Sequence, residues 1–585
     1  MRGDDASIEL GSLLPDDPLS SPTMSSPSPS PSPPPSFSAA TPPRWLRRPR
    51  RQPRFPSVTI RRASSRLANA HALPLLRRLA TLLRPRPTWR YVLSSAAALY
   101  VLYCLVTAQP LLASNLPPYT GPHGVGALDI EVPLGAPPRR VSDAVFRSSG
   151  DPAFEVESVL LTLYYPTEKG FRSDKPRYPW VPRPIGLTAE GYAKVAHIDN
   201  FVTRPVFTFF LWALAGSITI PAEVDAPLLA ADPFPPEDQG GADDARTEPQ
   251  QQQQQQQKQQ KFPLVVFSHG MASSRTDYTN YLGELASRGH VVAALEHRDG
   301  SSPGSLVRLG PSDPGRRRLP IHPSDLRGGM DTPEFKRAQL AYRDAEILAA
   351  IELLHAINAG IPINNVRAST SSTSSNSGSN SSANLPSWTR RLNTTHLTIA
   401  GHSYGATGAL QALSTASPSP GTTTSIILDP GKSSGPLSAN VSAPSLVIHS
   451  DSWSRRRSLF HGRPHFDTVR DLVRGVAASP HRIPAWFLTS RDTSHPSVTD
   501  APLIEPLLLS WTTGSGTDVR AALAEYVRAS DEFLRFARTG RRSPLLSEAV
   551  THEEYGKWVS EERRREFPKD WARRWEIHVA PDVIE

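Results

Sequence analysis

Cysteine is nearly absent from this chain of 585 residues, in which Cys104 is the only one. A single cysteine cannot form an intramolecular disulfide bond, and it excludes the zinc and iron–sulfur sites that several cysteines would build. Hydrophobic residues are also scarce for a single packed body, at 38%, whereas proline is common, with 60 residues. Low apolar content with abundant proline is typical of disordered segments. The composition therefore predicts a packed core together with long segments outside it.

Acidic residues are absent from residues 44–90, which carry fourteen arginines. The whole chain has a net charge of +9, to which residues 1–43 contribute −4 and residues 91–114 contribute nothing. The remaining 471 residues therefore have a net charge of −1. A folded domain that binds nucleic acid usually has a basic surface. Because the bulk of this chain is electrically neutral, we expect no nucleic-acid partner.

Residues 1–90 are expected to form a cytoplasmic tail that is first rich in proline and serine and then rich in arginine. A Pro/Ser-rich tract buries too little apolar surface to offset its conformational entropy, which predicts disorder. The next eighteen residues, 91–108, carry no charge. With the two leucines after Pro110, the apolar run reaches the length of about 20 residues that crosses a bilayer. We therefore predict a single transmembrane anchor at residues 91–112, with a buried helix, a signal peptide and a mitochondrial presequence as the alternatives.

The arginines before the predicted anchor orient it with its N-terminus in the cytoplasm, by the positive-inside rule. The chain after the anchor would then be lumenal or extracellular. Three glycosylation sequons lie in that part of the chain, at Asn380, Asn393 and Asn440. Such sequons are frequent by chance, so they agree with this topology without establishing it.

Short apolar strands alternate with helical segments along the rest of the chain. The periodicity of apolar residues predicts helices at 333–357 and from about residue 405, and strands at 156–165, 262–267, 290–295, 396–400, 425–428, 445–449 and 485–489. Fully apolar strands separated by helices indicate a mostly parallel sheet with helices on both faces. We therefore predict an α/β fold.

The α/β domain is predicted to span residues 113–545. Two low-complexity segments interrupt it, an acidic and Gln-rich one at residues 235–261 and a Ser/Asn-rich one at residues 369–386. Both are expected to be solvated surface loops. Residues 546–585 are rich in Glu and Arg, and we expect them to form a charged helical extension that packs on the domain.

The pattern Gly-X-Ser-X-Gly occurs three times, at residues 300–304, 401–405 and 431–435. Only the second copy lies between a predicted strand and a predicted helix. A nucleophile elbow needs that context, because its sharp turn exposes the serine hydroxyl at the carboxyl end of a sheet. The alternative is a structural turn with the serine at a helix N-cap. We predict that Ser403 is a catalytic nucleophile.

A serine hydroxyl needs a base that takes its proton, and that base is usually a histidine oriented by a carboxylate. In hydrolases with such an elbow, the acid follows the serine and the histidine comes last. His495 follows the last predicted strand and is therefore the predicted base. Two acids follow strands after the serine, Asp429 and Asp451. The residues alone leave the choice between these two acids open.

Acyl transfer also needs backbone N–H donors for the oxyanion. One donor is expected from Tyr404, which follows the nucleophile, and the other from the loop after an early strand. That loop reads SHGMASS and predicts Met271 as the second donor. An ordinary tight turn at His269 and Gly270 is the alternative interpretation.

Several separate blocks of the sequence resemble the plasma-type platelet-activating-factor acetylhydrolase family. They are FPLVVFSHGMASSRTDYTNYLGELASRGHVVAALEHRDGS, LTIAGHSYG and SIILD, in that order, and the similarity extends upstream to PPYTGPHGVGALDIEVP and downstream to about Ala537. Several blocks in the same order make the resemblance more specific than one elbow would. The resemblance implies an α/β-hydrolase fold.

The resemblance also implies an activity, that of a calcium-independent serine esterase of the 1-alkyl-2-acetylglycerophosphocholine esterase type. Such an enzyme removes a short or oxidised acyl group from the sn-2 position of a glycerophospholipid, with no cofactor and no metal. The family's triad acid matches Asp429, with Asp451 as the rival, and its histidine matches His495. Its oxyanion donors match Met271 and Tyr404.

One departure from the family concerns the segment after the acid. The family commonly has an aromatic residue there, whereas this chain continues PGKSSG after Asp429, so the acyl preference is open. The expected partners are a phospholipid substrate and a membrane, and the sequence carries no signal for an oligomeric state. The alternatives are another membrane-anchored carboxylesterase on the same fold and a non-catalytic hydrolase-fold binding module.

Overall fold

The computed structural model of the chain describes residues 88–107, 110, 113–135, 137–230, 261–367, 385–415, 423–455, 459–460, 463–505 and 516–581. Nearly all of the predicted tail and most of the two low-complexity segments lie outside these ranges, as does the sequon at Asn380. Of the described residues, those from 103 onward belong to one compact unit and residues 88–102 to another.

Residues Trp89–Thr107 form one α-helix, α3, which includes most of the predicted membrane anchor. Within the described ranges, no helix combines the length and the apolar character that a membrane crossing requires. The predicted span counted the residues on both sides of Pro110, but α3 ends at Thr107, and its Arg90, two serines and three tyrosines lower its hydropathy. The predicted single-pass anchor at residues 91–112 is therefore wrong. The predicted localisation, with a cytoplasmic N-terminus and a lumenal or extracellular domain, depended on that anchor and is not supported.

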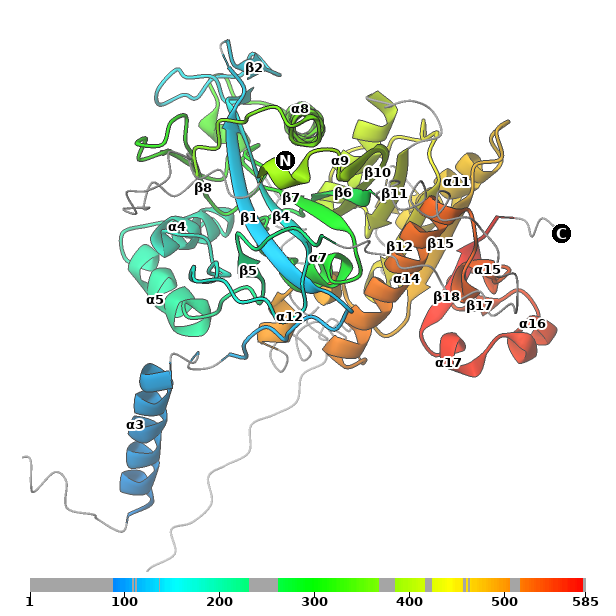
Figure 1. The fold of residues 1–585 in the computed structure, drawn as a ribbon, viewed down its shortest axis with the longest axis horizontal. Helices are drawn as coiled ribbons and strands as arrows, with labels where there is room; N and C mark the ends of the chain where they lie inside the picture. The colour runs from blue at the N-terminus through cyan, green and yellow to red at the C-terminus, as the bar shows by residue number, and fades with distance from the viewer. Residues whose placement is uncertain are drawn as a thin grey trace, which may run out of the picture. The chain divides into compact units, whose positions relative to one another are not determined.

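A ten-stranded mixed sheet organises the larger unit (Figure 1). Its strands in chain order are β1 (Gly124–Pro133), β4 (Ser158–Thr167), β5 (Glu223–Val224), β6 (Phe262–Ser268), β7 (Val291–Leu295), β10 (Leu392–His402), β11 (Thr423–Leu428), β12 (Ser445–Ser450), β15 (Ala485–Ser490) and β18 (Trp575–Val579). Across the sheet the order is β18-β15-β12-β11-β10-β6-β7-β4-β1-β5. The run from β15 to β7 is parallel. By contrast, β18 is antiparallel to β15, β4 is antiparallel to β7, and β1 is antiparallel to β4.

Helices cover both faces of this sheet (Figure 1). The helices on one face are α8 (Thr332–Ala359), α9 (Tyr404–Thr415) and α11 (His465–Ala477), and those on the other include α7 (Thr279–Ala286) and α14 (Val519–Thr539). Alternate residues of a strand point to opposite faces. In β6, Leu264 and Val266 pack in the core on the first face, and Val265 and Phe267 pack in the core on the second. Burial on both faces explains the fully apolar strands, and the α/β prediction is confirmed for these elements.

Three strands at or near the edges, β1, β5 and β18, are not among the predicted ones. β18 lies in the segment 546–585, for which the sequence predicts a charged helical extension. That segment contains two short helices, α16 (Glu561–Glu566) and α17 (Lys569–Ala572), but it also contains β18, whose five residues are all buried. The charged residues around β18 dominate the local composition, so the sequence pattern does not predict this short strand at the edge of the sheet.

The predicted nucleophile elbow lies where β10 meets α9. β10 ends at His402 and α9 begins at Tyr404, so Ser403 alone makes the turn, with a left-handed φ of 55°. A Cβ atom on Gly405 would lie 2.0 Å from the Ser268 carbonyl oxygen, and one on Gly401 would lie 2.3 Å from the Gly405 oxygen. Only glycine permits this close approach of strand, turn and helix.

Replacing Gly405 with alanine is expected to destabilise the elbow. The new methyl group would meet backbone atoms of β6, which cannot move away as a flexible side chain could, so we expect a loss of about 1–3 kcal/mol in the free energy of unfolding. The matched control is Gly475→Ala in α11, where a Cβ atom meets nothing within 4 Å. That change should stabilise the helix by roughly 0.5–1 kcal/mol. Thermal unfolding of both variants tests this, and an unchanged Tm for Gly405→Ala would contradict the packing described.

Candidate active site

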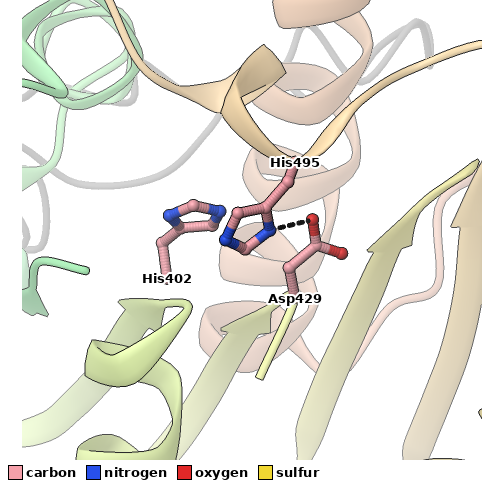
Figure 2. Close-up of side chains that lie close together, drawn as sticks. All are labelled: His402, Asp429 and His495. Atoms are coloured by element: carbon pink, nitrogen blue, oxygen red, sulfur yellow. Dashed lines mark hydrogen bonds and ion pairs between the residues drawn. The ribbon is translucent and has the colours of Figure 1, made fainter. Parts of the chain in front are cut away.

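Ser403, His495 and Asp429 form a hydrogen-bonded chain at the carboxyl end of the sheet. The Ser403 hydroxyl lies 3.0 Å from Nε2 of His495, and Nδ1 of His495 lies 2.9 Å from Oδ2 of Asp429. Figure 2 shows the His495 ring with its Nδ1 atom directed at the Asp429 carboxylate. With the proton on Nδ1, the other ring nitrogen is free to accept the serine proton. The structure therefore brings together the three residues for which the sequence predicts nucleophile, base and acid.

The Asp429 carboxylate is held by the neighbouring strand. The backbone N–H of Ser450 donates to its Oδ1 at 2.6 Å, and the Ser450 hydroxyl donates to its Oδ2 at 2.7 Å. Burial raises the pKa of Asp429 to about 6, against the opposing effect of these two donors. The carboxylate is therefore ionised at neutral pH and oriented toward His495, but its ionisation is costly.

Asp451, the rival acid, has different partners. It begins the short helix α10 (Asp451–Arg455), accepts a hydrogen bond from the backbone N–H of Asp492 at 3.1 Å, and contacts Arg455 and Tyr555. The histidine that the sequence could pair with either acid is hydrogen-bonded to Asp429.

Trp453, which the sequence did not single out, stacks on the candidate base. Its ring lies parallel to the His495 ring, with 3.9 Å between centroids and 11° between planes. The indole N–H donates to the Pro430 carbonyl at 3.0 Å, which ties the tryptophan to the segment after Asp429.

The His402 ring lies next to the His495 ring, with 4.5 Å between the ring centroids (Figure 2). Its Nδ1 atom lies 2.9 Å from the Tyr278 hydroxyl, which accepts a hydrogen bond from the Gly270 N–H at 3.1 Å. Burial lowers the pKa of His402 to about 3, so this ring is neutral. Its place inside the Gly-X-Ser-X-Gly pattern was the only sequence signal for it.

His402, Asp429 and His495 also offer ligand atoms within 4.8 Å of one another. Within the part of the chain that the structure describes, they are the only group of three such residues close enough to hold a metal ion. The His495 and Asp429 atoms of that group already form the hydrogen bond that orients the base. Two of the three candidate ligand atoms are therefore engaged with each other in this structure.

Arg343 of α8 contacts both segments from which oxyanion donors are predicted. Its Nη1 donates to the His269 carbonyl at 2.6 Å, two residues before Met271, and its guanidinium lies over the Tyr404 ring, 4.5 Å from the centroid. The Arg343 side chain is itself fully buried and paired with Asp299 at 2.8 Å. No pattern in the sequence marks this arginine, because it occupies an ordinary position in a helical stripe.

A cavity of about 270 Å³ opens beside the serine. Ser403, His495 and Met271 line it together with mostly apolar side chains, which include Trp180, Tyr192, Val195, Pro496 and Ala501. Two of these, Tyr192 and Val195, come from the helix α4 (Ile185–Val195). A substrate in this cavity would contact the Ser403 hydroxyl and the apolar side chains around it.

Comparison with known proteins identifies the family. Residues 243–541 match the family model of platelet-activating factor acetylhydrolase, isoform II. Platelet-activating factor acetylhydrolase from Cavia porcellus is 26% identical over 302 residues, which are 52% of this chain and 52% of that protein. The Gallus gallus protein of the same name is 25% identical over 308 residues, 51% of this chain and 57% of that protein. The chain thus matches little more than half the length of these curated relatives.

Two further similarities are more limited. A putative phospholipase A2 from Schizosaccharomyces pombe (strain 972 / ATCC 24843) is 36% identical over 154 residues, 25% of this chain and 33% of that protein. The solved structure of a ferulic acid esterase from Streptomyces cinnamoneus aligns with a TM-score of 0.43 at 18% identity, covering 74% of this chain and 96% of that one. The fold described above depends on the strand order and not on that alignment.

The choice between the two acids gives a prediction with a matched control. Asp429→Asn should lower kcat by about four orders of magnitude, because an amide favours the wrong tautomer of the histidine. Asp451→Asn removes a neighbouring carboxylate that does not contact His495 and should retain most of the activity. Steady-state hydrolysis of an activated ester by both variants decides this. A large loss in Asp451→Asn with activity retained in Asp429→Asn would reverse the assignment.

Asp429→Asn should also stabilise the protein at neutral pH. The folded-state pKa of Asp429 is raised to about 6 from 3.8, so the folded state binds its proton more tightly than the unfolded state does. The protonated carboxyl group therefore favours the folded state at low pH, and this stabilisation is lost as the pH rises through 6. Removing the ionised group should therefore raise the free energy of unfolding at pH 7.5 by up to about 3 kcal/mol. Chemical denaturation at pH 7.5 and pH 5 measures this, and a gain that grows toward pH 5 would contradict it.

Proposed function

Because the chain belongs to the platelet-activating factor acetylhydrolase, isoform II family, we propose that it is a serine esterase that hydrolyses an acyl ester of phospholipids. The substrate class is a glycerophospholipid with an acetyl or short oxidised acyl group at sn-2, and the reaction needs no calcium. The observation that carries the proposal is the hydrogen-bonded chain from Ser403 through His495 to Asp429, at the wall of an apolar cavity.

In the first step, the Ser403 oxygen attacks the sn-2 carbonyl carbon while Nε2 of His495 takes the hydroxyl proton. Asp429 accepts the Nδ1 hydrogen bond and stabilises the imidazolium that forms. The backbone N–H groups of Met271 and Tyr404 donate to the oxyanion of the tetrahedral intermediate. The ester bond to the glycerol then breaks, and His495 returns the proton to the glycerol oxygen, so that the lysophospholipid leaves with a free hydroxyl.

In the second step, water attacks the acyl group that is now bonded to Ser403. His495 takes one proton from the water and gives it to the serine oxygen as the acyl bond breaks. The products are a carboxylic acid and the restored serine. His495 works between two rings, Trp453 and His402, which limit the rotation that would break either of its hydrogen bonds.

Two properties of the surroundings support a phospholipid with a short sn-2 chain. The cavity, at about 270 Å³, is just below the range of about 300–1,000 Å³ that is typical of small-molecule sites. A cavity of this size suits a short acyl chain better than a long one. The helix α5 (Thr203–Ala215), which packs against α4, exposes about half of the side chains of Phe209, Phe210 and Trp212. An apolar surface on the helix that packs against α4 suits a substrate that is delivered from a lipid surface.

A carboxylesterase with a simpler substrate is the second candidate. The observation that favours it is the segment after Asp429, which lacks the aromatic residue expected in the family. The non-catalytic alternative is disfavoured, because such a module would be expected to lack a member of the Ser403, His495 and Asp429 chain.

Release of acetate from a 2-acetyl phosphatidylcholine by the full-length chain, with a chelator present, tests the proposal. Ser403→Ala should lose at least about three orders of magnitude in rate, because the nucleophile is absent. Ser433→Ala is the matched control, since Ser433 stands in another Gly-X-Ser-X-Gly copy without the strand and helix of an elbow. It should retain the native rate.

The substrate class is decided by a series of sn-2 chain lengths and by p-nitrophenyl acetate. The phospholipase assignment predicts that kcat/KM is highest for short-chain phospholipids and falls as the chain lengthens. If p-nitrophenyl acetate is hydrolysed through Ser403 while no phospholipid is, the serine esterase stands and the phospholipid assignment fails.

A further inference from the structure

A second cavity, of about 230 Å³, adjoins the candidate active site. The N-terminal half of α4 lines it through Leu187 and Thr188, whereas the C-terminal half lines the active-site cavity. The segment after β6 is shared in the same way, with Thr276 on the second cavity and Asp277 on the first. The two cavities are therefore neighbours, but the second contains none of the residues of the Ser403, His495 and Asp429 chain.

The wall of the second cavity carries an excess of positive charge. Its charged side chains are Asp129, Arg183, Arg275, Arg308 and Arg367. The carboxylate of Asp129 is already paired with Arg275 at 2.7 Å. Arg367 is paired at 2.7 Å with Glu131, which also accepts from Arg298 at 2.6 Å. Four arginines thus line the cavity with one acid, and two of them, Arg275 and Arg367, are paired with carboxylates.

The Arg308 side chain makes no hydrogen bond or ion pair among the described residues. Its Nε atom is buried without a hydrogen-bond acceptor, although its backbone N–H donates to Glu131 at 3.0 Å. A buried guanidinium N–H that lacks an acceptor costs more than a neutral donor would. An acceptor that enters the cavity would remove this cost.

The N-terminus of α4 contributes a second source of positive potential. This helix has eleven residues, its N-cap residue Pro184 makes no side-chain cap, and its first turn contains no acid. Pro184, Leu187 and Thr188 line the cavity, so the first turn of the helix borders it. Pro184 has no N–H and the Leu187 N–H donates to the Pro184 carbonyl at 3.0 Å, so this helix end contributes its dipole, which favours an anion.

The arginines also affect one another. Burial and the positive charge of Arg275 lower the pKa of Arg367 from its ordinary value, against the effect of Glu131. Two guanidinium groups that repel each other across a cavity are stabilised when an anion lies between them.

We propose that this cavity is a binding site for a phosphate-type oxyanion, with Arg308 and Arg367 as its charged ligands and the first turn of α4 as its third side. The anion is either free inorganic phosphate or the phosphodiester of a lipid headgroup, which share this chemistry. Binding at this site does not require the esterase activity, so the inference stands or falls independently of the proposed function.

Isothermal titration of the full-length chain with inorganic phosphate, at low ionic strength, tests the proposal. The native chain should bind phosphate saturably, and Arg308→Gln should weaken binding by at least tenfold. Because Arg308 makes no ion pair among the described residues, this change should leave the fold intact, which circular dichroism verifies. The matched control is Arg337→Gln, an exposed arginine on α8 outside the cavity, and it should bind phosphate like the native chain.

Competition identifies the source of the anion. If sn-glycero-3-phosphocholine displaces phosphate from the native chain but has no effect on Arg308→Gln, the site accepts a headgroup phosphodiester. If only inorganic phosphate binds, the site is one for a free anion, and both results support the oxyanion site. An absence of saturable binding, equal binding by Arg308→Gln, or the same heat from sodium chloride at matched ionic strength would overturn it.

Discussion

The left-handed turn at Ser403 is the constraint on which the candidate site depends. A non-glycine residue with a φ of 55° is strained by about 1–3 kcal/mol, and the surroundings must enforce it. Gly401 and Gly405 do so by letting β10, α9 and the end of β6 approach until no Cβ atom fits between them. The strain is therefore balanced by packing at the centre of a parallel sheet. As a result, the hydroxyl lies at hydrogen-bond distance from His495.

The side chains around this turn are held in place by buried contacts. His495 packs against Trp453 and His402, and Asp429 is fixed by two hydrogen bonds from Ser450. A buried carboxylate with a raised pKa reduces stability at neutral pH, but its hydrogen bond fixes the orientation of His495. On the other side, the buried Arg343 contacts the two segments that would stabilise an oxyanion. The site is thus rigid and preorganised at some cost in stability.

The sequence predicts the elements whose signals are local. Apolar strands, the helical stripe of α8 and the elbow around Ser403 are visible in it because each follows from short-range periodicity or turn chemistry. The choice of Asp429 over Asp451 is not, since both follow strands and only the register of β11 and β12 brings one of them to His495. Trp453 and Arg343 act through contacts between distant segments, which no local pattern records. The prediction of a membrane anchor is wrong because the apolar residues were counted past Thr107, where the helix α3 ends.

Labelling with a fluorophosphonate tests most directly whether Ser403 is a nucleophile activated by His495. Covalent modification of the full-length chain is expected at one residue, identified by peptide mass spectrometry as Ser403. Labelling should be lost in His495→Ala, whose far-UV circular dichroism should match that of the native chain. Labelling at another serine, or labelling of Ser403 at an unchanged rate in His495→Ala, would show that Ser403 is not a nucleophile activated by His495.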